Sequence, residues 1–332
     1  MGADCEDSCR WQHCDVADQE PKERIEPLTG AEGRRRLLDG LLPFVKLATD
    51  YAREVIDGPM LADAGSTAMK EVNAEHLFAT DEWLRPAHNA HSYGCILAVF
   101  LADHLSAFAA SCTAPYVGPT YAHLTLLRPI VESAPVAHWL LDPDATVLHR
   151  VQRAIIYRWD SAFNLKRNSH LPSAVEGADD DMAKIKRYLS LRVAASTRSE
   201  WSWTGEPKGG GLIVGEQRLP HPDGSFARLL FGRASTFDRT LWNYLSAAGH
   251  GTFYALREGL SLPADASADS LDPDSTVRGY VVDSRRVMQF GLIGFRAVDA
   301  VVRARDALMG WTSSAERDAA AQALYELDRD LA

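Results

Sequence analysis

The side chains best suited to chemistry in this chain lie in residues 239–251, RTLWNYLSAAGHG. Read as a helix, the segment places its polar residues on one face: Arg239, Asn243, Ser246 and His250. The residues between them are mostly apolar or aromatic, which predicts a helix with little surface open to solvent. Because an unpaired buried polar group costs roughly 1–3 kcal/mol, we expect these side chains to meet protein partners or a ligand.

A second polar group lies in residues 126–142, LLRPIVESAPVAHWLLD. Arg128 and Glu132 share one helical face, and their apolar neighbours predict that both are partly buried. Arginine and glutamate at this spacing can satisfy each other. They therefore form either an ion pair that joins two helices or one wall of a pocket.

In the pocket interpretation, the two polar groups line one semi-buried site for a small anionic or polar ligand. The ligand-binding candidates are Arg128, Arg239, Asn243 and Ser246. Either arginine could anchor a phosphate or carboxylate. His250 is a catalytic candidate because histidine transfers protons near neutral pH, and Glu132 is the second. At a helix end near Gly249 or Gly251, His250 could instead be a cation that favours the helix dipole. The pattern predicts binding and leaves turnover open.

Other interpretations stay open. Residues 85–91, RPAHNAH, fit the Arg-x(4–6)-His spacing of the HEPN ribonucleases, metal-independent enzymes of toxin and defence systems in which Arg85 and His91 would act across a homodimer. However, Pro86 stands where that family usually has a polar residue. A non-enzymatic structural or interaction protein, in which the polar residues only join helices, is another alternative.

A class I terpene-cyclase-like enzyme acting on a prenyl diphosphate is a further alternative. Asp179–Asp181 would bind Mg²⁺ beside aromatic residues, although we expect this acidic run at a helix start. The second metal motif is missing, since Asn243, Ala247 and Gly251 occupy its steps. Outside this alternative we expect no cofactor or metal. The Cys5, Cys9 and Cys14 group matches no zinc pattern.

Composition limits the class of protein. The 332 residues carry a formal charge of −10, which argues against a general affinity for nucleic acid or anionic membranes. No apolar run reaches the 18 or so residues of a membrane helix, and no secretory signal is visible. We therefore expect a cytoplasmic protein with a small-molecule partner, and the five cysteines fit a reducing compartment.

Hydrophobic periodicity predicts an all-α fold, a multi-helix bundle of seven to nine helices. Residues 1–30 form a flexible acidic tail, and a helical domain follows over 31–332. Within it, residues 200–232 form a loop or small β-hairpin insertion, and 261–274 form a linker. The predicted helices begin near Ala31, Tyr93, Tyr121, Val147, Met182, Thr236, Ser275 and Ser313. Pro129 and Pro135 interrupt the third.

Three segments also resemble a group of all-helical proteins from actinobacteria, the high-GC Gram-positive bacteria. They are LLRPIVESAPVAHWLLDPD (126–144), HRVQRAIIYRWD (149–160) and WNYLSAAGHG (242–251). The group's pattern is an Arg-Pro-x-x-Glu helix that ends in Trp-Leu-Leu-Asp-Pro, followed by a late Tyr-x-x-Leu-Ser-x-x-x-His-Gly helix. The resemblance implies an all-α fold and singles out Arg128, Glu132, Ser246 and His250. It implies no reaction, because no activity is established for the group.

Overall fold

A computed structural model describes residues 31–331 of the chain, except 82, 114–121, 197–198, 206–210, 233–236 and 250–283. The predicted tail (1–30), the predicted linker (261–274) and His250 lie outside the described residues. Arg239 lies within a described helix, but its side chain is outside the description.

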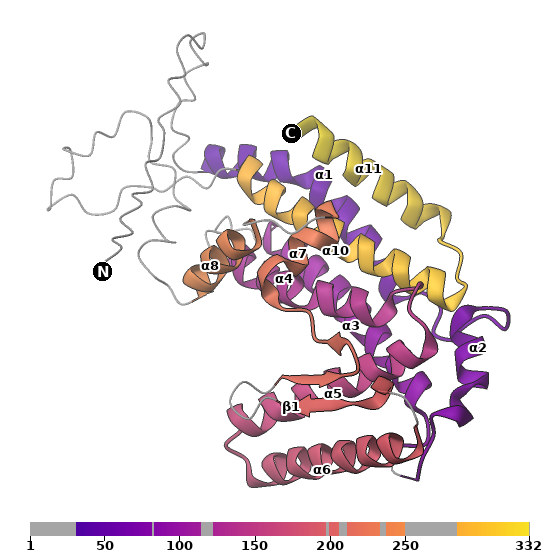
Figure 1. Cartoon of the computed structure of the whole chain (residues 1–332). Helices are drawn as coiled ribbons and strands as arrows, with labels where there is room; N and C mark the ends of the chain where they lie inside the picture. Colours follow the sequence, from indigo (N-terminus) through magenta and orange to yellow (C-terminus); the bar gives the residue numbers. More distant parts are fainter. Residues whose placement is uncertain are drawn as a thin grey trace, which may run out of the picture.

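Helices make up most of the described chain, and the predicted all-α fold is confirmed (Figure 1). The α-helices are α1 (Ala31–Ile56), α2 (Thr67–Asn73), α3 (Pro86–Ser111), α4 (Ala122–Leu141), α5 (Val147–Asn168), α6 (Pro172–Ala195), α7 (Pro222–Phe231), α8 (Phe237–Gly249), α10 (Ser284–Met309) and α11 (Ala315–Leu331). Two 3-10 turns, η1 (Glu75–Leu77) and η2 (Ser199–Trp201), accompany them. The short helices α2 and α7 were not expected.

Three helices begin at a proline, at Pro86, Pro172 and Pro222. Proline favours the first helical turn because its fixed φ suits the helix and its missing N–H is not needed there. The predicted starts of α3 near Tyr93 and of α6 after Asp181 were therefore wrong, and so was the expectation that residues 222–231 are not helical. The acidic run Asp179–Asp181 lies inside α6 rather than at its start.

Helix α4 continues through both of its prolines, Pro129 and Pro135, so the predicted interruption is wrong. A proline inside a helix removes a backbone hydrogen bond and costs about 3 kcal/mol. Extensive packing offsets this cost here. Along α4, one buried apolar residue follows another in almost every turn: Leu124, Leu127, Ile130, Val131, Ala134, Ala137, Leu140 and Leu141.

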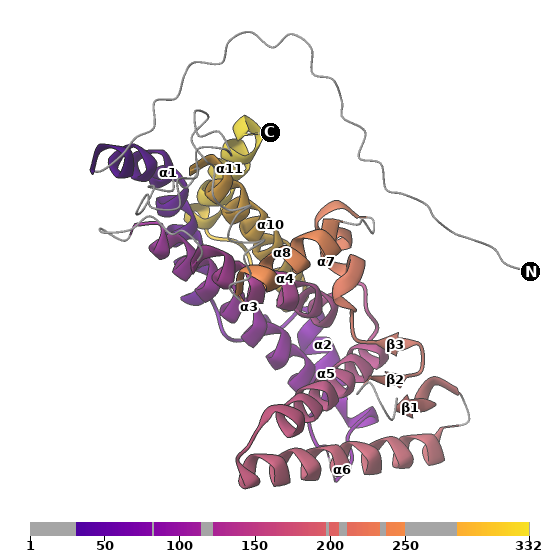
Figure 2. The same ribbon diagram turned by 90° about the vertical axis from the view of Figure 1, so that its left-hand side faces the viewer.

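The larger core lies between α1, α3, α4, α10 and α11, which Figures 1 and 2 show side by side, with α7 and α8 packed against α4. Close helix approaches depend on glycine. A Cβ on Gly94 of α3 would overlap Leu141 of α4, and one on Gly291 of α10 would overlap Phe44 and Phe108. These positions let four helices of the core, α1, α3, α4 and α10, approach more closely than any side chain would permit.

A second core joins α5 and α6 to a small antiparallel sheet, in strand order β1-β2-β3. The strands are β1 (Trp203–Gly205), β2 (Leu212–Val214) and β3 (Gln217–Arg218). Trp203 pairs with Val214, and Val214 with Gln217. Buried Leu212 and Val214 belong to the same cluster as residues of α5 and α6. The predicted insertion thus consists of these strands followed by α7.

Helix α3 is the one described helix that is long and apolar enough, by length and composition, to cross a membrane. Of the 18-residue stretch of α3 that meets this criterion, 39% is buried inside the protein. Its buried residues include Leu101, Leu105 and Phe108, which belong to the larger core. Core packing therefore accounts for part of its apolar character.

Candidate functional site

Arg128 and Glu132 form the ion pair that their spacing allows. Nε of Arg128 donates to Oε1 of Glu132 over 2.8 Å, and the two side chains are 30% and 39% exposed. The pair therefore lies at the edge of the protein interior, where water still reaches both groups. Its geometry satisfies both charges without a ligand.

Helix α8 contacts this pair through Trp242. The indole Nε1 donates to Oε1 of Glu132 over 3.2 Å, and the guanidinium of Arg128 lies 5.7 Å from the centre of the indole ring. The structure thus brings together the two helices that carry the predicted site residues. The described contact between them is made by an aromatic residue from outside the predicted polar face.

The rest of that polar face lies elsewhere on α8. Asn243 is exposed and Ser246 is half-buried, whereas Leu241 and Leu245 turn towards the core. The side chain of Arg239 and all of His250 lie outside the described residues. Whether these residues and the Arg128–Glu132 pair share a ligand remains a prediction.

The ribonuclease motif divides between surface and core. Arg85 precedes α3 and is exposed, while His91 is 4% exposed and its Nε2 lies 2.7 Å from Oε2 of Glu71. The same carboxylate oxygen accepts from Nε of Arg150 over 2.7 Å. This buried position gives no support to a role for His91 in cutting RNA.

Arg150 is the largest fully buried side chain and anchors this internal cluster. Besides Glu71, its guanidinium donates to the carbonyl oxygens of Leu140, Asp142 and Ala145. It therefore fixes the turn between α4 and α5. Sequence reasoning missed the cluster, and no local spacing could reveal it, because Glu71 and Arg150 are 79 residues apart.

The acidic run of α6 is occupied by surface ion pairs. Asp181 pairs with Arg158 over 2.6 Å, Asp179 with Lys166 over 2.6 Å and Asp180 with Lys184 over 2.6 Å. The side chains of the three aspartates are between 36% and 57% exposed. Among the described residues, no group of three or more His, Cys, Asp or Glu could hold a metal ion. Each carboxylate of the run is thus paired with a cation at the surface, and the prenyl diphosphate alternative stays a prediction.

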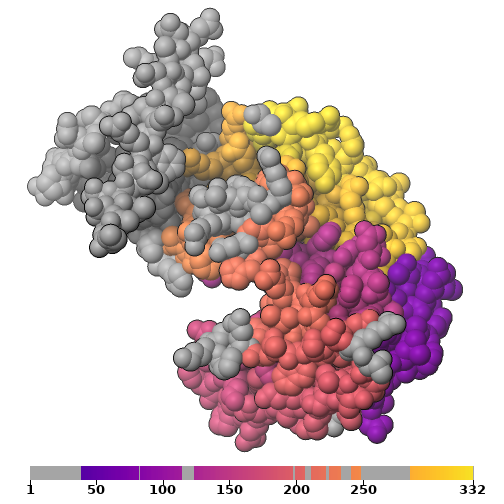
Figure 3. Space-filling model, in the orientation of Figure 1, coloured from indigo at the N-terminus to yellow at the C-terminus, as the bar shows by residue number. Residues whose placement is uncertain are grey.

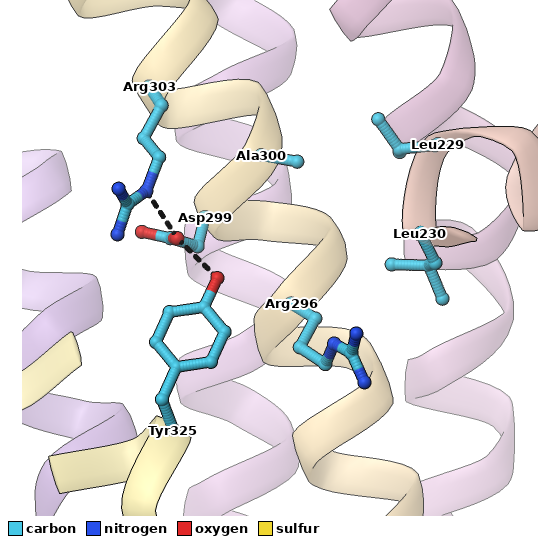
Figure 4. A pocket seen from close by; sticks show the side chains of 7 residues that line it. All are labelled: Leu229, Leu230, Arg296, Asp299, Ala300, Arg303 and Tyr325. Carbon is cyan, nitrogen blue, oxygen red and sulfur yellow. Dashed lines mark hydrogen bonds and ion pairs between the residues drawn. The ribbon is translucent and has the colours of Figure 1, made fainter. Parts of the chain in front are cut away.

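A cavity of about 390 Å³ opens between α7, α10 and α11 (Figure 4). Its lining combines two arginines, one aspartate, one tyrosine and three aliphatic residues: Arg296, Arg303, Asp299, Tyr325, Leu229, Leu230 and Ala300. This volume lies near the lower end of the range for small-molecule sites, roughly 300–1,000 Å³. None of the residues proposed from the sequence lines it.

Asp299 is the centre of this cavity and is 3% exposed. Its Oδ2 accepts from the hydroxyl of Tyr325 over 2.7 Å and from Nε of Arg303 over 2.6 Å, and its Oδ1 accepts from Tyr51 over 2.9 Å. Figure 4 shows Arg303 and Tyr325 converging on the carboxylate. Three donors from three helices thus satisfy a charge that could not otherwise stay buried.

The two tyrosines keep their protons because of this setting. Burial and the contact with Asp299 raise the pKa of Tyr51 well above its usual value, and the same two causes raise the pKa of Tyr325. The hydrogen bond to Asp299 raises the pKa of Arg303. Both tyrosine hydroxyls are therefore protonated at pH 7 and donate to Asp299.

A second cavity of about 200 Å³ adjoins the first and shares Asp299 and Arg303 with it. Its remaining lining comes mainly from α11, the preceding turn and α10: Tyr51, Asp306, Trp311, Ser313, Arg317, Asp318 and Ala321. Asp306 pairs there with Arg317. Opposite charges within this smaller space already compensate each other.

Figure 3 also shows a hollow in the surface between the part formed by α8 and the part formed by α5, α6 and the sheet.

Where the chain passes from α4 to α5, Arg153 donates to Gln217, to the carbonyl of Trp139 and to Asp142. Burial alone would raise the pKa of Asp142, but hydrogen bonds from Arg153 and from the N–H of Asp144 hold it below its usual value. This network ties the sheet to α4 and α5.

The α10 residues could have been found from the sequence by the same reasoning that was applied to α8. Arg296, Asp299 and Arg303 recur at steps of three and four within residues 290–304, which are otherwise apolar or glycine, so they share one face. A comparison of the chain with known proteins found no matching family model, no matching curated protein and no matching solved structure.

Proposed function

We propose that this protein binds a small anionic ligand in the cavity between α7, α10 and α11. The observation that carries the proposal is that the seven lining residues include two arginines and only one aspartate. The aspartate is already satisfied by three donors, so it offers little to a cationic ligand. The arginines still have donors to give.

The exposure of the two arginines favours this assignment. The side chain of Arg303 is 67% exposed, whereas the side chain of its partner Asp299 is only 4% exposed. Their hydrogen bond uses Nε of Arg303. An arginine has five N–H donors, so the Nη groups of Arg303 can still donate to a ligand. Arg296 is 35% exposed, and its pair with Asp328 is long, at 3.3 Å. A carboxylate or phosphate could therefore compete for both.

The experiment is calorimetric titration with phosphate, acetate and succinate. Arg296→Gln and Arg303→Gln should each lower the affinity for the anion by roughly 10- to 100-fold, because a hydrogen bond to a charged group contributes about 1.5–3 kcal/mol. Arg53→Gln is the matched control, since its side chain is 62% exposed and belongs to a different surface pair. An anion affinity that is unchanged in both arginine variants would overturn the proposal.

Arg128→Gln tests the site proposed from the sequence in the same titration. If the α4–α8 residues bind the ligand, this variant and Ser246→Ala should weaken binding while Arg296→Gln does not. A structural role for the same residues is the second candidate. It is favoured by the bridge from Trp242 to Glu132, and it predicts a loss of stability without any change in binding.

A further inference from the structure

The wall of the larger cavity that belongs to α7 is apolar. Leu229 and Leu230 come from the end of this helix, and both pack partly against the larger core. Ala300 of α10 adds a third aliphatic surface, and Tyr325 adds an aromatic ring. A small inorganic anion held by the arginines would leave this wall in contact with water.

An exposed aromatic residue lies beside one of the arginines of the cavity. Phe231 follows Leu230 and is 46% exposed, and the guanidinium of Arg296 lies 5.7 Å from the centre of its ring. Its place is fixed because α7 ends there. The N–H of Gly232 donates to the carbonyl of Arg228 over 2.9 Å, at a φ of +68° that glycine adopts readily. Arg296, which lines the cavity, thus also lies against an aromatic face.

We propose that the ligand is an amphipathic acid, a carboxylate whose aliphatic or aromatic body covers Leu229, Leu230 and Phe231 while its charged head binds Arg296 and Arg303. This inference rests on the proposed anion site and specifies the chemistry of its ligand. Burial of each CH₂ group contributes about 0.8 kcal/mol, or roughly fourfold in affinity. An open cavity covers only part of a chain, so the gain per group will be smaller.

The test compares acetate with octanoate by titration calorimetry, with octylammonium as the charge-reversed control. Octanoate should bind at least tenfold more tightly than acetate, and octylammonium should bind more weakly than octanoate. Arg296→Gln should weaken both acids. Phe231→Ala should weaken octanoate binding about threefold more than it weakens acetate binding. Leu171→Ala, which is also an exposed apolar residue (67%), should change neither.

A second variant keeps the test decisive if Phe231→Ala perturbs α7. Ala300 is half-buried and lines the cavity, so Ala300→Leu should narrow the space for octanoate without removing the arginines. Equal binding of acetate and octanoate, with both lost in Arg296→Gln, would overturn the amphipathic ligand and leave the anion site standing. Octanoate binding that survives Arg296→Gln would also overturn it. Failure of every acid to bind would overturn the proposed function itself.

Discussion

Trp242 of α8 donates to the same carboxylate oxygen of Glu132 that accepts from Arg128, over 3.2 Å and 2.8 Å. One oxygen atom thus joins two helices and neutralises a cation. Both contacts use Oε1, and Oε2 of Glu132 takes no part in them. The arrangement explains why α4 can carry a charged pair beside an almost continuous apolar core.

Removal of the indole N–H should reveal what this contact contributes. Trp242→Phe keeps an aromatic ring against Arg128 and should lower the free energy of unfolding by about 0.5–1.5 kcal/mol, the usual net value of one hydrogen bond. Urea denaturation gives the number. In the background of Glu132→Gln the same change should cost less, because the charge-assisted acceptor is gone. An equal loss in both backgrounds would mean that the bond contributes nothing.

The buried cluster of Glu71, His91 and Arg150 should be far more sensitive. Glu71→Ala leaves a fully buried arginine without its carboxylate, and such changes cost about 3–5 kcal/mol. Glu326→Ala is the control, because its pair with Arg329 is exposed on both sides, and we expect a change within about 0.5 kcal/mol. Thermal or urea unfolding measures both. A loss below about 1 kcal/mol for Glu71→Ala would contradict the anchoring role of Arg150.

Two glycines in helices offer opposite outcomes for one substitution. Gly94→Ala should destabilise the fold, typically by about 1–3 kcal/mol, because its Cβ would overlap Leu141. Gly177 of α6 has no atom within 4 Å of its would-be Cβ. Gly177→Ala should therefore stabilise by about 0.4–1 kcal/mol. Denaturation midpoints compare them directly, and a stabilising Gly94→Ala would show that α3 and α4 can separate without cost.

Stability should fall in alkali because of Tyr51 and Tyr325. Both pKa values are raised in the folded protein, so the unfolded chain loses these protons first. The resulting stabilisation is complete below the unfolded pKa of about 10 and is lost as the pH rises through the folded values. Urea denaturation at pH 8, 10 and 11 should show this decline, and Tyr325→Phe should make it shallower. An unchanged slope would exclude Tyr325 as a contributor.

Asp142 should affect the free energy of unfolding at acidic pH. Its pKa is lowered in the folded protein, so its contribution is present above the unfolded value, about 3.9, and is lost as the pH falls through the folded value. Asp142→Asn should lower stability at pH 7 and reduce the fall between about pH 5 and pH 3. Asp160 provides a contrast, because burial raises its pKa, and Asp160→Asn should not reduce that fall.

The sequence alone determined which segments are helical and which side chains within one helix can pair. Apolar periodicity is local, so the predicted starts of α1, α5 and α11 lie close to the observed ones, and the spacing of Arg128 and Glu132 allowed the ion pair that forms. The starts of α3, α6 and α7 are also encoded locally, at Pro86, Pro172 and Pro222, because proline favours the first turn of a helix.

Only the tertiary structure decided which distant side chains meet. Asp299 and Tyr51 are 248 residues apart, and Glu71 and Arg150 are 79 apart. Helical periodicity shows that such residues share a buried face, but it contains no information on the helix that packs against that face. The cavity of Arg296, Arg303 and Tyr325 exists because α7, α10 and α11 converge. Its position was fixed by packing of the whole bundle rather than by any local pattern.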